Sequence, residues 1–267
     1  MSQPDIAAFF AQIGPFLHGA ASHAETAGAL YGAPADAVTA RHAERLAIYG
    51  RFCALHRLEA LKVFEATEAA ARQHAESRDG REAAAAAWSR LVERYFVAHP
   101  MHHFEINQNG EFFPEFLAAT LAAEPEALPP FIAELADFEW WEWLVIIAPD
   151  ADSDQPADAG PLRLSSTVDL RPYHYDFVGW LDAEPDERGA APEPGEHIVF
   201  FWRDRTLRGR RERALPLELI LVKAILEGMR IDEELAAQVG VDFAELSETL
   251  ADLHAAGIVL GAVSEAG

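Results

Sequence analysis

Apolar residues recur at steps of three and four along most of the first 148 positions, the spacing of one face of an α-helix. The clearest run predicts a long helix over Asp36–Gln73, with Ile48, Phe52, Leu55, Leu58, Leu61 and Phe64 on its buried face. Asp79-Gly80 is a turn signal. Further helices are expected at Asp5–His18, Arg81–Ala98, Glu115–Ala123 and Pro130–Ile147.

The period changes to two beyond Ala148–Gly160, a segment rich in Asp, Ala and Pro that is typical of a flexible linker or long loop. Strands are expected at Arg163–Tyr175 and His197–Asp204. In the second of these, Ile198–Trp202 is apolar without alternation, which predicts a strand covered on both faces. The charged segment Arg208–Leu215 is expected to be its hairpin partner, and its charge suits the edge of a sheet.

Three short helices are predicted after the hairpin, and glycines mark their ends at Gly228, Gly240 and Gly257. Asp242 and Glu245 form a start for the third helix that resembles a capping box. A small sheet followed by three helices predicts a winged-helix-like arrangement.

Together these patterns predict an α+β protein of two domains, for which 267 residues give enough material. A helical domain is expected over residues 1–150, and a winged-helix-like domain with a small antiparallel sheet over residues 161–267.

Charge and cysteine content limit the partners and the cellular compartment that the chain is expected to have. The chain has 21 Lys and Arg residues against 44 Asp and Glu residues, a formal net charge of −23, which repels phosphate backbones and anionic membranes. Cys53 is the one cysteine, so no intramolecular disulfide is possible. Neither a basic secretory signal nor a long uncharged apolar run is present, and we expect a cytoplasmic protein without membrane or nucleic-acid partners.

Six arginines nevertheless lie between Arg203 and Arg213. They can protect an edge strand against stray pairing, bind DNA as a basic wing, or pair with acidic side chains of a peptide that adds to the open edge. DNA binding is opposed by Ile231–Ala256, which has seven acidic residues and no Lys or Arg. The peptide interpretation predicts a site made of Arg208, Arg210, Arg211 and Arg213, with a groove near Leu246, Leu250 and Leu253.

Two other clusters are candidates. His99, His102 and His103 are weak candidates for metal ligands, because their spacing matches no standard site and a structured loop explains them as well. Trp140, Trp141 and Trp143 span more than one face of a helix, so at least one should be exposed or lie at an interface.

No catalytic residues are assigned. The phosphate-binding loop, the dinucleotide fingerprint and the nucleophile elbow are all missing from the sequence. Cys53 falls within a predicted helix and is expected to be buried and unreactive.

Five segments in order resemble the HvfC/BufC family of peptide-modification chaperones. They are "RLAIYGRFCALHRLEALKVF", "HPMHHFEINQNGEFFPEFLAATL", "LPPFIAELADFEWWEW", "STVDLRPYHYDF" and the hairpin with its three helices. The most informative motifs are Leu-Ala-x-Tyr, Phe-Pro-x-Phe-Leu and Leu-Ala-x-x-Glu-Trp. The chain departs from the family at Gly50, where an Arg or Asn run commonly follows the tyrosine, and in its histidine-rich loop.

The resemblance implies a non-catalytic partner of a TIM-barrel, multinuclear non-haem iron oxidase that modifies a ribosomally made precursor peptide. The iron is expected in the oxidase, and no cofactor in this chain. The C-terminal half also resembles the PqqD-like leader-recognition domain, in which a leader peptide adds to the sheet edge. The helical domain would dock the oxidase, with Trp140, Trp141 and Trp143 as anchors. The alternatives are a winged-helix transcription regulator and a metal-binding protein that uses the His99–His103 loop.

Overall fold

The computed structural model describes residues 52, 54–149, 158–184 and 187–262. The predicted helix Asp5–His18, the first part of Asp36–Gln73, Cys53 and most of the linker lie outside these residues. The chain is α+β, as predicted. It divides into two compact units between Ala136 and Asp137, a boundary inside helix α7 (Ile132–Ile147) and well before the predicted linker.

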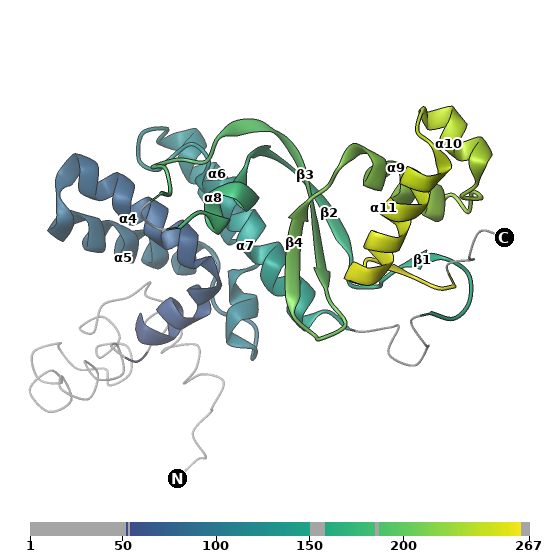
Figure 1. Cartoon of the computed structure of the whole chain (residues 1–267). Coiled ribbons are helices and arrows are strands. Elements are labelled where there is room, and N and C mark those ends of the chain that lie inside the picture. Colours follow the sequence, from purple (N-terminus) through teal and green to yellow (C-terminus); the bar gives the residue numbers. More distant parts are fainter. Residues whose placement is uncertain (1–51, 53, 150–157, 185–186, 263–267) are drawn as a thin grey trace, which may run out of the picture. The chain divides into compact units, whose positions relative to one another are not determined.

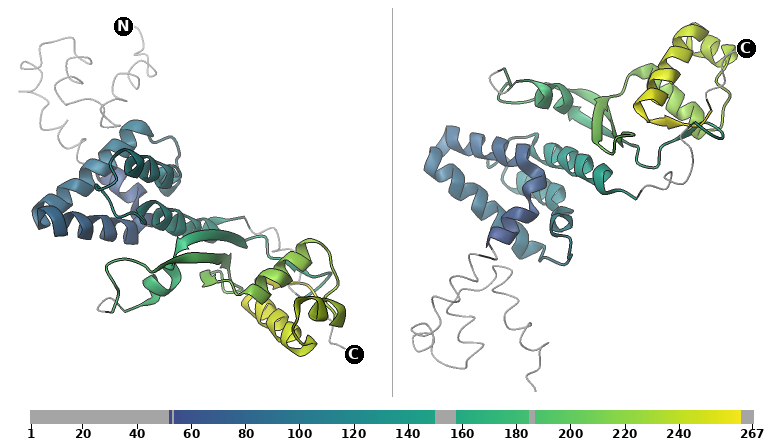
Figure 2. Two further views of the ribbon diagram at one scale, coloured as in Figure 1. Left: turned by 90° about the horizontal axis from the view of Figure 1, so that it is seen from above. Right: turned by 60° about the horizontal axis from the view of Figure 1, so that its bottom comes forward.

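The N-terminal unit is helical. Helices α4 (Glu65–Asp79) and α5 (Arg81–Ala98) lie side by side (Figures 1 and 2) and are joined at Gly80, whose φ of +85° favours glycine. Helix α5 has the predicted bounds. After it come the 3₁₀ turn η2 (Ile106–Gly110) and helix α6 (Phe113–Ala123), which begins two residues before the predicted start.

The predicted long helix is interrupted in its described part. Residues 54–60 are helical, and the chain then passes through Leu61 and the 3₁₀ turn η1 (Lys62–Phe64) before α4 begins. Phe64 is fully buried and packs on Phe113, with ring centroids 4.9 Å apart. A Cβ atom on Gly110 would lie 2.8 Å from the Phe64 ring, so this packing also needs glycine at that position. The interruption of the predicted helix therefore coincides with the position where Phe64 packs into the core.

The C-terminal unit contains two antiparallel sheets. Strands β2 (Asp169–Tyr175), β3 (Pro194–Arg203) and β4 (Gly209–Arg213) form a sheet in the order β2-β3-β4. The predicted strand Arg163–Tyr175 is divided, because its first two residues form β1 (Arg163–Leu164) and only Asp169–Tyr175 belongs to β2. Strand β1 pairs with β5 (Val259–Leu260) in a second sheet that the sequence did not predict. Two-residue strands carry no detectable periodicity. The short helix α8 (Phe177–Asp182) was also missed.

Both faces of β3 are covered, as its unbroken apolar run predicted. Phe201 packs on Phe138 of α7, with centroids 5.0 Å apart, and both side chains are fully buried. Phe200 and Trp202 point to the opposite face, into a core with Leu221 of α9. Side chains alternate along a strand, so one strand serves two cores.

Helices α9 (Pro216–Leu226), α10 (Glu233–Val239) and α11 (Phe243–Ala256) follow the sheet (Figures 1 and 2). Gly240 and Gly257 end the last two in the left-handed conformation, and the Asp242 carboxylate accepts the Glu245 N–H at 2.7 Å. These helix ends confirm the predictions. No helix among the described residues has the length and apolar character needed to cross a bilayer.

Candidate functional site

Strand β4 is an edge strand of its sheet, and α8 packs close to it. Ala214 N–H donates to the Ile198 carbonyl at 2.8 Å, and Asp204 N–H donates to the Arg208 carbonyl at 2.9 Å. Antiparallel pairing alternates, so the main-chain groups of even-numbered residues from Arg208 to Ala214 face β3. The N–H and C=O groups of Gly209, Arg211 and Arg213 therefore point away from it. Within the described chain these outward groups have no hydrogen-bond partner.

Three of the four arginines assigned to the site already have carboxylate partners in the same unit. Arg211 pairs with Glu142 of α7 and with Asp182 of α8, the latter at 2.8 Å. The other two pairs are Arg213–Asp176 and Arg210–Asp204, the latter at 2.6 Å.

The Arg208 side chain differs from these three, because it is exposed and has no partner among the described residues. The sequence prediction assumed four arginines available to a guest, and the structure leaves one unpaired. The carboxylates that pair with Arg211 and Arg213 come from distant segments, so the local pattern could not reveal them, whereas Asp204 lies six residues before Arg210 in the same hairpin.

The Arg211–Glu142 pair is partly desolvated. Burial raises the pKa of Glu142, and the Arg211 guanidinium offsets this only in part. Removing Arg211 would therefore leave a desolvated carboxylate without its main partner. In the Arg213–Asp176 pair, burial alone would raise the pKa of Asp176, but the Arg213 guanidinium and the Gly179 N–H outweigh it and lower that pKa.

The opposite face of β4 carries charges of both signs, because Arg210 and Glu212 both lie on it. Glu212 pairs with Phe200 in the register and therefore faces α9–α11. The pKa of Glu218 is raised, first by burial and then by the negative charges of Glu212 and Asp252. The two flanks of this edge thus carry different charge patterns, which the count of arginines in the sequence did not indicate.

The predicted groove leucines lie elsewhere. Leu246, Leu250 and Leu253 are 0%, 6% and 2% exposed and belong to the core that contains Phe200 and Trp202. The part of the prediction that placed them in an open groove is corrected, because the inward side chains of β3 already fill the space beside them.

The tryptophans of α7 lie on a helix that covers the sheet. Trp140 is 9% exposed, and Trp141 and Trp143 are partly buried, so none of the three is a fully exposed side chain. The Arg171 guanidinium lies 4.4 Å from the centroid of the Trp141 ring, and the Trp140 and Trp143 rings are 4.9 Å apart. A docking role for these residues stays a prediction.

Asp137 also anchors α7 to the sheet. The Tyr173 hydroxyl donates to the Asp137 carboxylate at 3.0 Å, and Arg171 donates to its other oxygen at 3.4 Å. Burial, followed by the Asp137 charge and hydrogen bond, raises the pKa of Tyr173 far above its usual value. The "DFEWWEW" segment is therefore explained within the C-terminal unit by covering the sheet.

The histidine-rich loop is organised by an asparagine that the sequence analysis missed. The Asn109 side-chain oxygen accepts the N–H groups of His102 and His103 at 2.7 and 2.9 Å. Its amide nitrogen donates to the carbonyls of His103, Glu105 and Ile106. The side chain is 1% exposed, and the Tyr95 hydroxyl donates to its main-chain carbonyl at 2.7 Å.

The histidine side chains themselves point to different partners. His102 Nε2 lies 3.0 Å from Glu111, His103 Nδ1 accepts the Glu105 N–H, and the His99 ring stacks on Phe112. Among the described residues, no three His, Cys, Asp or Glu side chains are arranged to hold a metal ion. The loop geometry therefore gives no support to a metal site here.

Asp204 fastens the turn of the β3–β4 hairpin. Its carboxylate accepts the Thr206 hydroxyl at 2.6 Å, the Thr206 and Arg208 N–H groups, and Arg210 Nε. The Thr206 hydroxyl contributes most, and together these donors outweigh burial and lower the pKa of Asp204 well below its usual range.

The Asp204→Asn variant is expected to reduce the acid sensitivity of the fold. A lowered folded-state pKa means that the charged group stabilises the protein fully above the ordinary aspartate pKa of about 3.9, and that this stabilisation is lost progressively as the pH falls from there through the lower folded-state pKa. In urea titrations, the loss of unfolding free energy between about pH 7 and about pH 3 should be smaller than in wild type. Asp158→Asn, at a carboxylate 72% exposed, is the control. An unchanged pH dependence in Asp204→Asn would contradict the prediction.

Comparison with known families gave no matching family model, and no curated protein matched the chain. The resemblance to the HvfC/BufC family therefore stays a hypothesis.

Proposed function

We propose that this protein is a non-catalytic accessory protein that binds the leader of a ribosomally synthesised precursor peptide as a strand added to the outer edge of β4. The observation that carries the proposal is the set of outward main-chain groups at Gly209, Arg211 and Arg213, which have no partner within the described residues. Such groups can bind an extended peptide through main-chain hydrogen bonds.

The sequence resemblance supports the rest of the proposal. The bound leader would be presented to a TIM-barrel, multinuclear non-haem iron oxidase, which supplies the iron and the chemistry. The helical N-terminal unit would dock that enzyme. A three-stranded sheet followed by α9, α10 and α11 is consistent with the interpretation that the C-terminal unit is winged-helix-like and resembles PqqD.

The ion pairs change what the edge is expected to recognise. Arg211 and Arg213 already neutralise carboxylates, so an acidic guest residue would have to share them. Main-chain bonding then provides most of the affinity, and Arg208 provides an unpaired cation at the hairpin end of the strand. We expect weak dependence on guest charge and strong dependence on an extended guest backbone.

Neither alternative function gains support from the described residues. The stretch 231–256, which contains α10 and α11, carries seven carboxylates and no Lys or Arg, and this opposes binding to phosphate backbones. The His99–His103 loop has its side chains turned to separate partners.

Proline substitutions test the edge, because proline removes one N–H donor. The register shows that Arg210 N–H faces β3, whereas Arg211 and Arg213 N–H groups face outward. Arg210→Pro should damage the hairpin. Arg213→Pro should keep it and weaken the leader about tenfold, the loss expected for one main-chain hydrogen bond of about 1.4 kcal/mol. Arg213 is preferred to Arg211 because its side chain is more exposed, 46% against 21%.

The measurement is calorimetry with a synthetic leader peptide of the precursor that the proposed oxidase modifies. Circular dichroism verifies the fold of each variant. Arg213→Ala is the matched control, which keeps the N–H group and should weaken binding only a few-fold, because exposed ion pairs contribute up to about 1 kcal/mol. A folded Arg213→Pro variant that binds as well as Arg213→Ala would rule out strand addition at this edge.

A further inference from the structure

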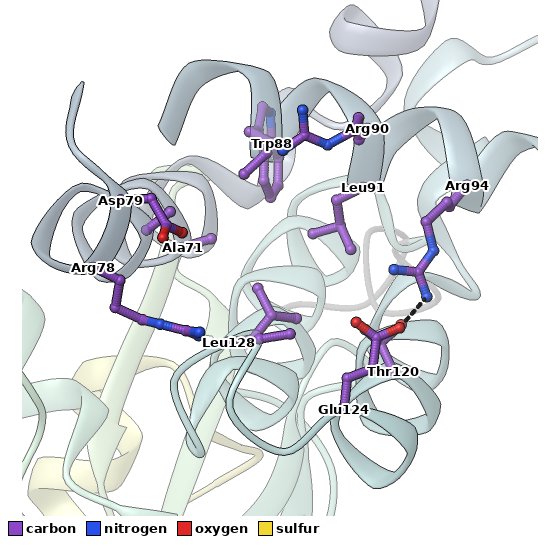
Figure 3. A pocket seen from close by; sticks show the side chains of 13 residues that line it. Ala71, Arg78, Asp79, Trp88, Arg90, Leu91, Arg94, Thr120, Glu124 and Leu128 are labelled. Atoms are coloured by element: carbon purple, nitrogen blue, oxygen red, sulfur yellow. Dashed lines mark hydrogen bonds and ion pairs between the residues drawn. The ribbon is translucent and has the colours of Figure 1, made fainter. Parts of the chain in front are cut away.

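The N-terminal unit contains a pocket of ≈ 330 Å³ between α4, α5 and the chain around the end of α6 (Figure 3). Pockets of this size hold small organic ligands. Its lining comes from α4, α5, α6 and the chain just after α6.

Small side chains on facing helices create the space. Ala71 and Ala75 of α4 and Ala87 of α5 present only methyl groups to it, while Trp88 and Leu91 are large and buried. These apolar groups give the interior a lining suited to an aliphatic or aromatic body.

Two hydrogen bonds hold one wall of the pocket. His74 Nε2 lies 3.1 Å from the Glu126 carbonyl, and the Arg78 guanidinium donates to the same carbonyl. They connect α4 to the chain after α6, beside Leu128. The wall is therefore tied to the helix pair by contacts distant in sequence.

Three arginines line the pocket, Arg78, Arg90 and Arg94, together with the carboxylates Asp79 and Glu124. Arg94 pairs with Glu124 at 3.4 Å, and Arg78 is bound to a main-chain carbonyl. The Arg90 guanidinium is exposed and has no partner among the described residues. In Figure 3, Asp79 lies on the α4 side of the view, away from Arg90 and Arg94.

We propose that this pocket binds a small organic anion whose apolar body lies against Trp88, Leu91 and Leu128 and whose acidic group, a carboxylate or sulfonate, pairs with Arg90. An anion of this kind satisfies both features of the pocket, since burial of its apolar body supplies affinity and the guanidinium selects its charge. The site is separate from β4 and does not depend on the proposed peptide function.

Two fluorescent probes of nearly the same shape test the proposal on the full chain. 8-Anilinonaphthalene-1-sulfonate is the anion, and N-phenyl-1-naphthylamine lacks the sulfonate. Wild type is expected to bind both probes and to bind the anion more tightly. Arg90→Gln should weaken the anion about three- to fivefold, the scale of one exposed ion pair, and leave the neutral probe unchanged. Arg81→Gln, at an exposed arginine outside the pocket, should change neither.

Filling the pocket provides a second test. Ala87→Phe should abolish binding of both probes, whereas Ala86→Phe, at an exposed position on the same helix that does not line the pocket, should bind them as wild type does. Unchanged probe binding in folded Ala87→Phe would place the probes elsewhere and overturn the proposal. If Ala87→Phe does not fold, the arginine variants decide the question. The proposal is overturned if Arg90→Gln weakens the affinity for both probes equally, or if it changes the affinity for neither. Failure of wild type to bind either probe overturns it as well.

Discussion

Replacing Phe138 by alanine is expected to lower the free energy of unfolding of the C-terminal unit by about 3–5 kcal/mol, the range for truncating a buried phenylalanine. Phe138 is fully buried, and its ring contacts Phe201, Tyr173 and Phe177 at centroid distances of 5.0, 5.4 and 5.5 Å. The truncation removes both the buried area and the edge-to-face ring contacts.

Urea unfolding followed by near-ultraviolet circular dichroism measures this loss. Ile147→Ala is the control on the same helix, because Ile147 is 41% exposed and its truncation should cost no more than about 0.5 kcal/mol. If Phe138→Ala loses no more stability than the control, α7 does not hold the sheet in solution. Arg211 would then lose the helix that carries its partner Glu142, and the recognition properties proposed for the edge would have to be revised.

Asn109→Ala is expected to destabilise the N-terminal unit by about 3 kcal/mol or more. The change removes bonds to five main-chain groups of the histidine-rich loop, each of which contributes about 1 kcal/mol, and it leaves partly buried donors and acceptors unsatisfied. The loop should lose its order, and amide hydrogen exchange at His102 and His103 should become faster.

Asn107→Ala is the matched control from the same loop. The Asn107 side chain donates only to the Glu59 carbonyl at 3.1 Å, and that bond is exposed. We therefore expect a loss of less than about 1 kcal/mol and little change in exchange at His102. Similar losses in the two variants would show that Asn109 is not the centre of the loop.

Local signals in the sequence determined much of the C-terminal unit. The unbroken run Ile198–Trp202 predicted a strand covered on both faces, and Phe201 and Phe200 do enter opposite cores. The charged segment after it predicted an edge strand, and β4 is one. Gly240 and Gly257 marked the ends of two helices. Each of these features depends on residues a few positions apart, so the pattern itself contains the information.

The position of the aromatic helix was decided by tertiary contacts. The sequence placed the "DFEWWEW" segment in a helical domain that ended near residue 150, but the compact units divide at Ala136 and Asp137. Phe138 meets Phe201 and Asp137 meets Tyr173 across more than thirty positions of the chain. Helical periodicity shows that a segment has an apolar face, but it does not say which surface that face will cover.

The charge pattern of the edge strand β4 also depended partly on the sequence and partly on the tertiary structure. The sequence determined that several arginines lie on an edge strand, and therefore that the edge is charged. Only the tertiary structure determined that Arg211 and Arg213 are paired with Glu142 and Asp176, that Arg208 is not, and that Leu246 lies in the core. Electrostatic pairing depends on distance in space, and the partners here lie tens of residues away, so no local pattern of charge could specify it.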